Sequence, residues 1–543
     1  MYFRRNFIVI VLLFLFFIMW QFLKIDNFIK PTTLYSQEIS NFNNIVGDLK
    51  KSLILKKQEQ IISVITDVLS LKIGTRGGNI NQVSLLTYND KFNSMQPLNL
   101  FVTSKNFIYQ AQSGIVNNKQ NKLINYDEPL FNVNKDLYIL KNNQNELHVP
   151  LIYISSDNII YIKTFIFKRG NFNCNIKYNI INMSNTPLEL IFYGQLKQSI
   201  NLPLLHNNFL SQSYDYRNFA YYDINDKYKK YSFKNVEEIN LNSHINVNWI
   251  SMFQKYFATV FIPNFSEKNI LYSNFLKKEK QIIIGFKSKP FIIYPGNQTN
   301  VGAVLWMGPK IQDKMLLVAP HLDLMVDYGW LWFISKPLFK LLKFIYNYSY
   351  NWGLSIIIIT LIIRFIMYPL TKAQYISMIK MHLLKSKLKK IREKFVTNNQ
   401  LQGLEIIKLY KKEKVNPLGG FLLMIIQMPI FLALYNTLSE SIELRHSPFI
   451  LWINDLSSYD HYYILPILMG ITMFYVQKTS FNTLNNSNNK KFILLTPCLF
   501  TIFFLWLPSG LVLYYIVNNV ITIFQQFFIF NELDLCKLND KKF

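Results

Sequence analysis

Residues 351–371 are apolar enough to cross a membrane, yet they include a charged side chain, Arg364. A membrane-spanning helix needs roughly 20 mostly apolar residues, and this segment supplies them. An arginine near the centre of such a helix costs about 3 kcal/mol on insertion scales. We therefore expect Arg364 to face protein or water. The alternative is a side chain that reaches the lipid headgroups, because Lys372 lies only about two turns further on.

The composition is typical of a membrane protein with a soluble part, since half of the 543 residues are hydrophobic and only 17% are charged. The net charge of +26 is informative only where it clusters beside apolar segments, because lysines and arginines in short cytoplasmic loops set orientation. We do not take it as a sign of DNA binding. Cys174, Cys498 and Cys536 lie far apart, and no nucleotide-binding motif is present. We therefore expect no disulfide framework, metal site or cofactor.

Residues 1–24 contain an apolar run that follows Arg4 and Arg5. The run is longer than the core of a secretory signal and has no small-residue cleavage site after it. We expect an uncleaved signal anchor with its N-terminus in the cytoplasm; a cleaved signal is the alternative.

Residues 25–325 contain no apolar segment long enough to span, and several stretches alternate between apolar and polar residues. Strands are expected at residues 159–167, 172–180, 188–196, 257–262 and 281–286, with turns at Arg169-Gly170, Pro295-Gly296 and Gly308-Pro309. Residues 43–71 are less strand-like, and a helix or a loose linker is expected at their start. The prediction is a large antiparallel β-sandwich outside the cytoplasm.

The acids and histidines of this region show no spacing that would bring an acid and a base together; they include His148, His206, His244, Asp223 and Asp226. We expect a binding or structural domain rather than an enzyme, with no catalytic residues.

Residues 326–350 combine lysines at helical spacing, Lys336, Lys340 and Lys343, with many aromatic residues. Such a helix is expected to lie in the membrane interface, and packing against the β-domain is the alternative. Ser335 is expected to cap it, with Pro337 in its first turn.

Residues 372–415 follow the span with twelve Lys or Arg and only three acids. Met381, Leu384, Leu388, Ile391 and Phe395 step by three and four, which is typical of a helix seam. A break at residues 397–399 and a second helix at 400–412 predict an antiparallel helical hairpin in the cytoplasm. Its charge is either a solvated face with an orientation signal or a docking surface for acidic lipids, ribosomal RNA or a partner.

Residues 416–530 supply four further apolar segments, at 421–438, 462–477, 492–507 and 511–530, and Pro508-Ser509-Gly510 forms a tight turn between the last two. The lysine-rich loops then lie in the cytoplasm if six spans leave both termini there. Residues 531–543 form a short cytoplasmic tail.

The last span carries Tyr515, Asn519, Thr522 and Gln526 three or four residues apart, so they share one helical face. Such a stripe often only joins helices. Together with Arg364, and with Thr360 one turn away from it, these groups are also able to line a wet groove open to the cytoplasm.

Four segments carry a family resemblance: NWGLSIIIITLIIRFIMYPLTKAQY, KVNPLGGFLLMIIQMPIFLALYNTL, YYILPILMGITMFYVQK and FLWLPSGLVLYYIVNN. They resemble the YidC/Oxa/Alb family of membrane-protein insertases, in the long form of Gram-negative bacteria. The resemblance covers nearly the whole chain; in the β-region it is carried best by DYGWLWFISKPL and WISMFQKYF.

This resemblance implies six spans, five of them forming an insertase core in the inner membrane, and a periplasmic β-supersandwich. It implies a cytoplasm-facing hydrophilic groove around Arg364 and a client-contact face on the third and sixth spans near Tyr514 and Tyr515. The implied partners are nascent membrane-protein clients, the Sec translocon with its accessory subunits, membrane lipids and the translating ribosome. The tail departs from the family, because it is short and its charges cancel, so the hairpin is the better candidate for ribosome contact.

The mechanism expected from these residues is electrostatic. Arg364 attracts acidic residues of an incoming segment, and Thr360, Gln427 and the last span's polar face supply transient hydrogen bonds. Client hydrophobicity and the membrane potential supply the energy. One alternative is a secondary transporter that binds a small anion at Arg364, although the chain shows no internal repeat. Another is a membrane-anchored carbohydrate-active enzyme, for which the β-region offers no evident carboxylate pair.

Overall fold

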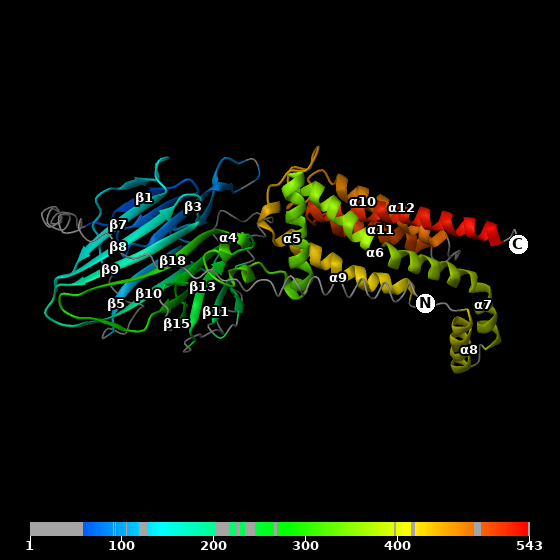
Figure 1. The fold of residues 1–543 in the computed structure, drawn as a ribbon, viewed down its shortest axis with the longest axis horizontal. Helices are drawn as coiled ribbons and strands as arrows, with labels where there is room; N and C mark the ends of the chain where they lie inside the picture. Colours follow the sequence, from blue (N-terminus) through cyan, green and yellow to red (C-terminus); the bar gives the residue numbers. More distant parts are fainter. Residues whose placement is uncertain are drawn as a thin grey trace. The chain divides into compact units, whose positions relative to one another are not determined.

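A computed structural model describes residues 58–540 apart from 91, 93, 105, 119–127, 202–216, 224, 226–227, 234–244, 265–268, 396–397, 414–418 and 483–489. The described chain begins with strands and ends with helices (Figure 1). The expected signal anchor lies outside the described residues, as do His206, His244 and Asp226.

The β-domain consists of two sheets. The first has ten strands in the order β15-β16-β10-β5-β3-β2-β1-β6, with β17 also paired to β10 and β4 to β3. The second has eight, in the order β12-β11-β13-β14-β18-β9-β8-β7. The strands are β1 (Ile61–Ile65), β2 (Leu69–Gly74), β3 (Ile80–Asn89), β4 (Pro97–Phe101), β5 (Tyr109–Asn117), β6 (Leu137–Ile139), β7 (Glu146–Ile154), β8 (Ile159–Lys168), β9 (Asn173–Asn182), β10 (Leu188–Ser199), β11 (Asn218–Asp223), β12 (Tyr228–Ser232), β13 (Val247–Phe253), β14 (Phe257–Pro263), β15 (Ile270–Leu276), β16 (Gln281–Lys287), β17 (Phe291–Ile293) and β18 (Gln298–Pro309).

All five strands expected from period-two patterns are present, as β8, β9, β10, β14 and β16. In β9 the alternate residues Cys174, Ile176, Tyr178 and Ile180 are buried, each no more than 1% exposed. These side chains join one continuous core with residues of both sheets, among them Phe192 of the first sheet. The alternation therefore marks the face that the sandwich buries.

The turns at Gly170 and Gly296 are confirmed, and both glycines adopt the left-handed conformation, with φ of 72° and 77°. The turn expected at Gly308-Pro309 is wrong, because both residues pair with β14 as the end of β18. A Cβ on Gly308 would come within 2.6 Å of the Phe172 side chain, so this glycine provides room for packing rather than a bend.

The helix or linker expected at the start of residues 43–71 lies outside the described residues. The rest of this stretch is more strand-like than expected, because it forms strand β1 and the first half of β2, which pair antiparallel from Ile61↔Gly74 to Ile65↔Ser70. Long-range pairing decides here over weak local propensity. One pair of the first sheet, β1 with β6, is parallel.

The helical region comprises α4 (Gln312–Leu316), α5 (Trp332–Ser349), α6 (Trp352–Leu383), α7 (Lys385–Lys394), α8 (Asn399–Lys412), α9 (Gly419–Glu440), α10 (Ile464–Asn482), α11 (Lys490–Phe504) and α12 (Ser509–Asp540). Short 3-10 turns lie at Leu322–Met325 (η4), Gly329–Leu331 (η5) and Ile442–Leu444 (η6). Each apolar segment expected from residue 351 onward is a helix. The tight turn expected at residues 508–510 lies earlier, because Ser509 already begins α12.

Helix α5 begins at Trp332, so the expected cap at Ser335 is wrong and Pro337 lies inside the helix. The Ser335 side chain is fully buried and donates a hydrogen bond of 3.0 Å to the carbonyl of Ala433 in α9. A small hydroxyl therefore serves the close packing of α5 on α9 instead of the helix end.

The lysines of α5 bind the acidic segment that follows the sandwich. Lys336 forms an ion pair of 2.7 Å with Asp323, and Lys343 pairs with Asp313. Large aromatic side chains of this region stay exposed, including Trp330 at 72% and Tyr348 at 74%. Such exposed aromatics suit a membrane interface.

Within the part of the chain that the structure describes, two helical segments are long and apolar enough to span a membrane, Trp352–Ser377 and Ser509–Ile529. Ile464–Thr479 and Leu495–Phe504 are shorter apolar helices. The expected count of six spans stays a prediction.

Candidate functional site

Arg364 lies in the middle of the apolar part of α6, and its side chain is only 4% exposed. A guanidinium in this position faces the interior of the helix bundle, since exposure to lipid would be unfavourable. Among the described residues no carboxylate lies within ion-pair distance of it. The positive charge is therefore held by neutral polar groups.

The carbonyl oxygen of the Asn518 side chain connects three helices, α6, α9 and α12, through two hydrogen bonds. Arg364 of α6 donates a hydrogen bond from Nε to this Oδ1 at 2.5 Å. Gln427 of α9 donates from Nε2 to the same oxygen at 3.4 Å. Asn518 itself belongs to α12 and is 5% exposed. One amide oxygen thus accepts from both neighbouring helices, which fixes the amide's orientation.

A second amide of α12 approaches the backbone at Arg364. Gln525 donates from Nε2 to the Arg364 carbonyl at 3.4 Å, and its buried Oε1 has no hydrogen-bond partner among the described residues. Thr360, one turn from Arg364, is 1% exposed and donates to the Ile356 carbonyl of its own helix at 2.6 Å. The threonine hydroxyl is thus satisfied locally.

The polar face expected on α12 divides between two neighbours. Asn519 donates to the Thr472 hydroxyl of α10 at 3.1 Å, and Gln526 donates to the Tyr375 hydroxyl of α6 at 2.6 Å. Thr522 donates to the Asn518 carbonyl within α12. None of these three side chains has a hydrogen bond to Arg364 in the described structure.

The two tyrosines lie at the contact of α12 with α9. Tyr514 is 2% exposed, and its ring stacks near Phe431 with centroids 6.4 Å apart. Tyr515 meets Phe431 edge-on at 5.9 Å and Phe504 at 5.1 Å. Both tyrosines lie close enough to the Arg364 guanidinium to interact with it electrostatically.

Sequence reasoning missed Asn518, Gln525 and Tyr375. The signal was present, because Tyr514, Asn518 and Gln525 also follow helical spacing. Two adjacent faces of α12 carry polar residues, and only the packing of α6 and α9 shows which face meets Arg364.

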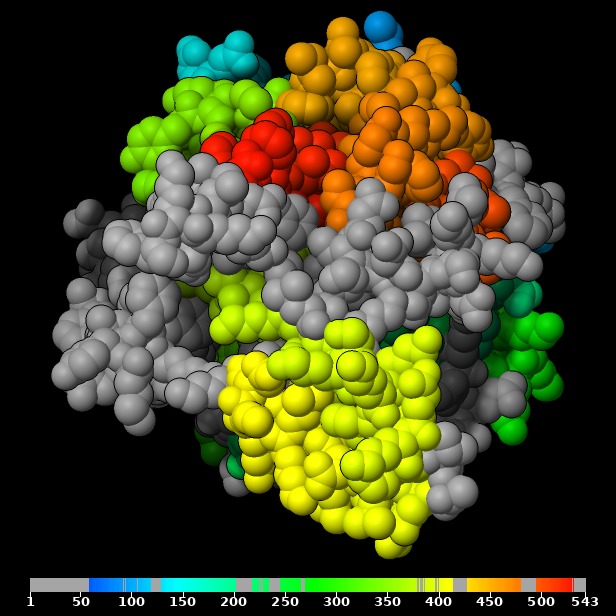
Figure 2. Space-filling view, turned by 90° about the vertical axis from the view of Figure 1, so that its right-hand side faces the viewer, coloured from blue at the N-terminus to red at the C-terminus, as the bar shows by residue number. Residues whose placement is uncertain are grey.

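The basic hairpin is formed by α7 and α8. Asn398 caps α8 by accepting from the backbone N–H groups of Gln400 and Leu401, both at 3.1 Å. Lys387 pairs with Glu413 at 2.7 Å and ties the two helices together. Figure 2 shows the hairpin as one continuous block in yellow and yellow-green. Most of its lysines are exposed, so a basic surface is available.

The β-domain contains a fully buried lysine, Lys163. Its Nζ donates to the carbonyls of Gly77, Gly78 and Ser113 at 3.0, 2.8 and 3.0 Å. Burial lowers the pKa of Lys163 to about 7. The ammonium joins β8 to the turn at Gly77-Gly78 and to β5, and this role is structural.

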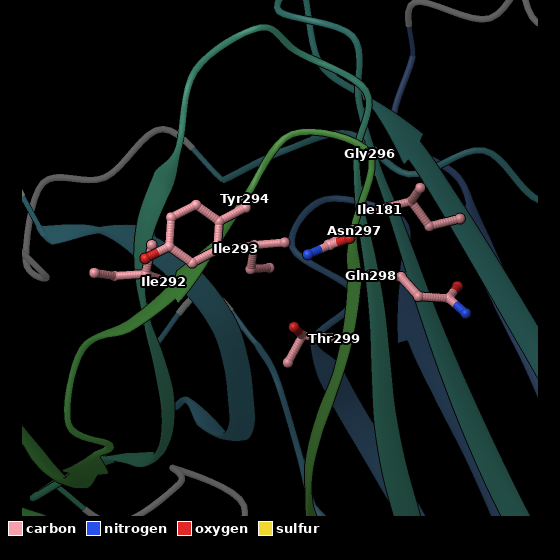
Figure 3. Close-up of a pocket in the computed structure, with 8 residues that line it drawn as sticks. All are labelled: Ile181, Ile292, Ile293, Tyr294, Gly296, Asn297, Gln298 and Thr299. Carbon is pink, nitrogen blue, oxygen red and sulfur yellow. The ribbon is translucent and has the colours of Figure 1, made fainter.

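A surface hollow of the β-domain lies beside the β17–β18 turn (Figure 3). Its lining is Ile181, Ile292, Ile293, Tyr294, Gly296, Asn297, Gln298 and Thr299. No carboxylate, histidine, cysteine or lysine is among these residues, so the hollow offers no acid–base pair.

Comparison with known families accounts for nearly the whole described chain. The YidC periplasmic domain family matches residues 61–341, and the 60Kd inner membrane protein family matches residues 344–535. This chain belongs to the YidC family. The first match covers the β-domain together with α4 and the start of α5, and the second covers the helical region from the end of α5.

Solved structures give weaker likenesses. The structure of an active YidC insertase with its first transmembrane domain resolved is 17% identical, with a TM-score of 0.36, over 89% of this chain and 98% of that one. An aldose 1-epimerase from Escherichia coli K12 is 8% identical over 46% of this chain and 99% of its own, with a TM-score of 0.28. A galactose mutarotase-like protein from Lactobacillus casei is 8% identical over 46% of this chain and 99% of its own, with a TM-score of 0.30. These scores carry no functional argument.

Membership of the YidC family assigns a function to the chain. The chain is a membrane-protein insertase of the inner membrane with a periplasmic β-sandwich domain, and its clients are membrane proteins. Arg364 and the amides around it lie in the 60Kd part, which is the membrane-embedded part.

Proposed function

We propose that this YidC protein inserts and helps to fold inner-membrane proteins through a hydrophilic groove that opens to the cytoplasm around Arg364. The observation that carries the proposal is a buried guanidinium whose hydrogen-bond acceptor is the neutral amide of Asn518 in α12, which in turn accepts from Gln427 of α9. A charge kept in an apolar helix without a carboxylate partner among the described residues is costly to the fold alone. We infer that the protein retains this costly charge because it binds a client segment.

The physical task is to move a polar segment across an apolar layer about 30 Å thick. Each unpaired backbone group costs several kcal/mol in hydrocarbon. A groove wet from one side shortens the dry path, and Arg364 attracts acidic residues of the client. Thr360, Gln427, Asn519, Thr522 and Gln526 supply hydrogen bonds in turn, and the apolar part of the client leaves along α9 and α12 past Tyr514 and Tyr515.

We infer six spans with both termini in the cytoplasm. This topology places the basic hairpin of α7 and α8 on the cytoplasmic side, as orientation by positive charge requires. The hairpin, rather than the tail, is the proposed contact for the translating ribosome and for acidic lipid headgroups. We also propose that the protein works with the Sec translocon for some clients and that it has no enzymatic activity.

Reconstitution tests this function. Purified protein is placed in liposomes of inner-membrane lipids, and a small single-span client is added as it is synthesised. Protease protection of the translocated segment measures insertion. The proposal requires more insertion than in empty liposomes, and equal insertion in both would refute autonomous insertase activity. An anion transporter would instead show Arg364-dependent uptake of a small anion without client insertion.

A further inference from the structure

The hydrogen bond between Arg364 and Asn518 holds the guanidinium by one edge. Nε is the donor, and the acceptor is an uncharged amide oxygen. Gln427 donates to that same oxygen, so Oδ1 rather than the NH₂ group of Asn518 faces the arginine. The arrangement orients the guanidinium plane without neutralising its charge.

The two terminal nitrogens of Arg364 carry the remaining N–H groups. No acceptor among the described residues lies within hydrogen-bond distance of them. Paired terminal N–H groups on a planar fork match the two oxygens of a carboxylate. The edge that recognises a carboxylate is therefore the edge that Asn518 does not occupy.

We propose that Asn518 is a positioning residue that presents the terminal nitrogens of Arg364 to a carboxylate of the client. The inference rests on the proposed insertase function and deepens it, because it names the residue that keeps the charge both oriented and available. An amide is required at this position. A carboxylate here would form a permanent buried ion pair with Arg364 and compete with the client.

The test compares two clients that differ in one residue. One carries a single aspartate in its translocated segment, and the other has asparagine at that position. Insertion of both is measured in liposomes with the full-length wild type and with the variants Asn518→Asp, Asn518→Ala and Asn436→Asp. The last variant is a matched control, because it makes the same amide-to-carboxylate change on α9 at a residue that contacts the Tyr328 carbonyl and not the Arg364 site.

Asn518→Asp should lower insertion of the acidic client by roughly tenfold or more, the scale of a buried charge pair, and leave the neutral client near its wild-type level. Asn518→Ala should lower insertion of the acidic client severalfold, because the guanidinium is no longer held in one orientation. Insertion of the neutral client should change little. Asn436→Asp should not separate the two clients, because its carboxylate lies away from Arg364. If Asn518 had only a structural role, its substitution would change insertion of both clients by the same factor.

Equal insertion of the two clients by Asn518→Asp overturns the inference, whether their common level is normal or reduced. Asn518→Ala decides in the same way without adding a buried charge that would disturb folding. Failure of the proposed function is a different result, because the wild type itself would then insert neither client better than empty liposomes.

Discussion

Gln526 donates a hydrogen bond from Nε2 to the hydroxyl of Tyr375 at 2.6 Å and thereby joins α12 to α6. Tyr375 lies eleven residues beyond Arg364, or about 16 Å along the helix at 1.5 Å per residue. Thr479 of α10 contacts the same glutamine. Helices α6, α10 and α12 therefore meet in a polar cluster around Gln526.

Tyr375→Phe should destabilise the helical region by about 1 kcal/mol, because the Gln526 amide loses its acceptor inside the bundle. Unfolding by SDS in mixed micelles measures the change. Tyr368→Phe is the matched control on α6, since the described structure gives its hydroxyl no hydrogen bond. Equal effects of the two substitutions would show that the Tyr375 contact contributes nothing specific.

The buried Lys163 predicts a pH dependence of the β-domain. Its pKa falls from 10.5 to about 7 on folding, so the unfolded chain binds up to one more proton between these values. The penalty for burying the charge is absent above pH 10.5, grows as the pH falls, and is complete below 7. The free energy of unfolding should therefore rise with pH across this window by up to about 1.4 kcal/mol per unit.

Lys163→Met should remove that slope and lower stability at pH 7 by about 3 kcal/mol, because three backbone carbonyls lose their donor. Urea unfolding read by thiol labelling of Cys174, which is buried in the β-domain, isolates this domain when the other two cysteines are serine. Identical slopes for wild type and variant would refute the assignment.

The ion pair of Lys336 with Asp323 should couple α5 to the segment that follows the sandwich. The two side chains are 23% and 18% exposed, so solvent screens the pair only in part. A double-mutant cycle with Lys336→Gln and Asp323→Asn should give a coupling of about 1 kcal/mol in the free energy of unfolding. The exposed Lys340, changed to glutamine in place of Lys336, should give none. Coupling for Lys340 as strong as for Lys336 would count against a specific pair.

The strands were predictable where one face is buried, as in β9, because alternation of apolar and polar residues records that face directly. Strands β1 and β2 were not, since their stability comes from pairing with distant partners. The hairpin was predictable from Asn398 and the seam around Leu388. The helix cap predicted at Ser335 was wrong because its hydroxyl donates a hydrogen bond to Ala433, 98 residues away in α9. No local capping rule can anticipate such a contact.

The candidate site was predictable only in part. An arginine in an apolar span identifies α6 without any structure. Gln427 was recognised as a polar residue of the next apolar segment, and Tyr514 follows from the resemblance to the insertase family. The hydrogen-bond partner of Arg364 on α12 was not predicted; it is Asn518, the neighbour of Asn519 in the expected polar face. Both are polar and adjacent, and a helix turns by about 100° between them, so packing alone decides which one meets the arginine.

The charge of Arg364 is tested most directly by client insertion into liposomes with wild type, Arg364→Ala and Arg364→Lys. The clients are the aspartate-bearing segment and its asparagine counterpart. Alanine should abolish most insertion of the acidic client, lysine should retain part of it through charge without the planar fork, and all three proteins should insert the neutral client. Undiminished insertion of the acidic client by Arg364→Ala would contradict an electrostatic role for Arg364.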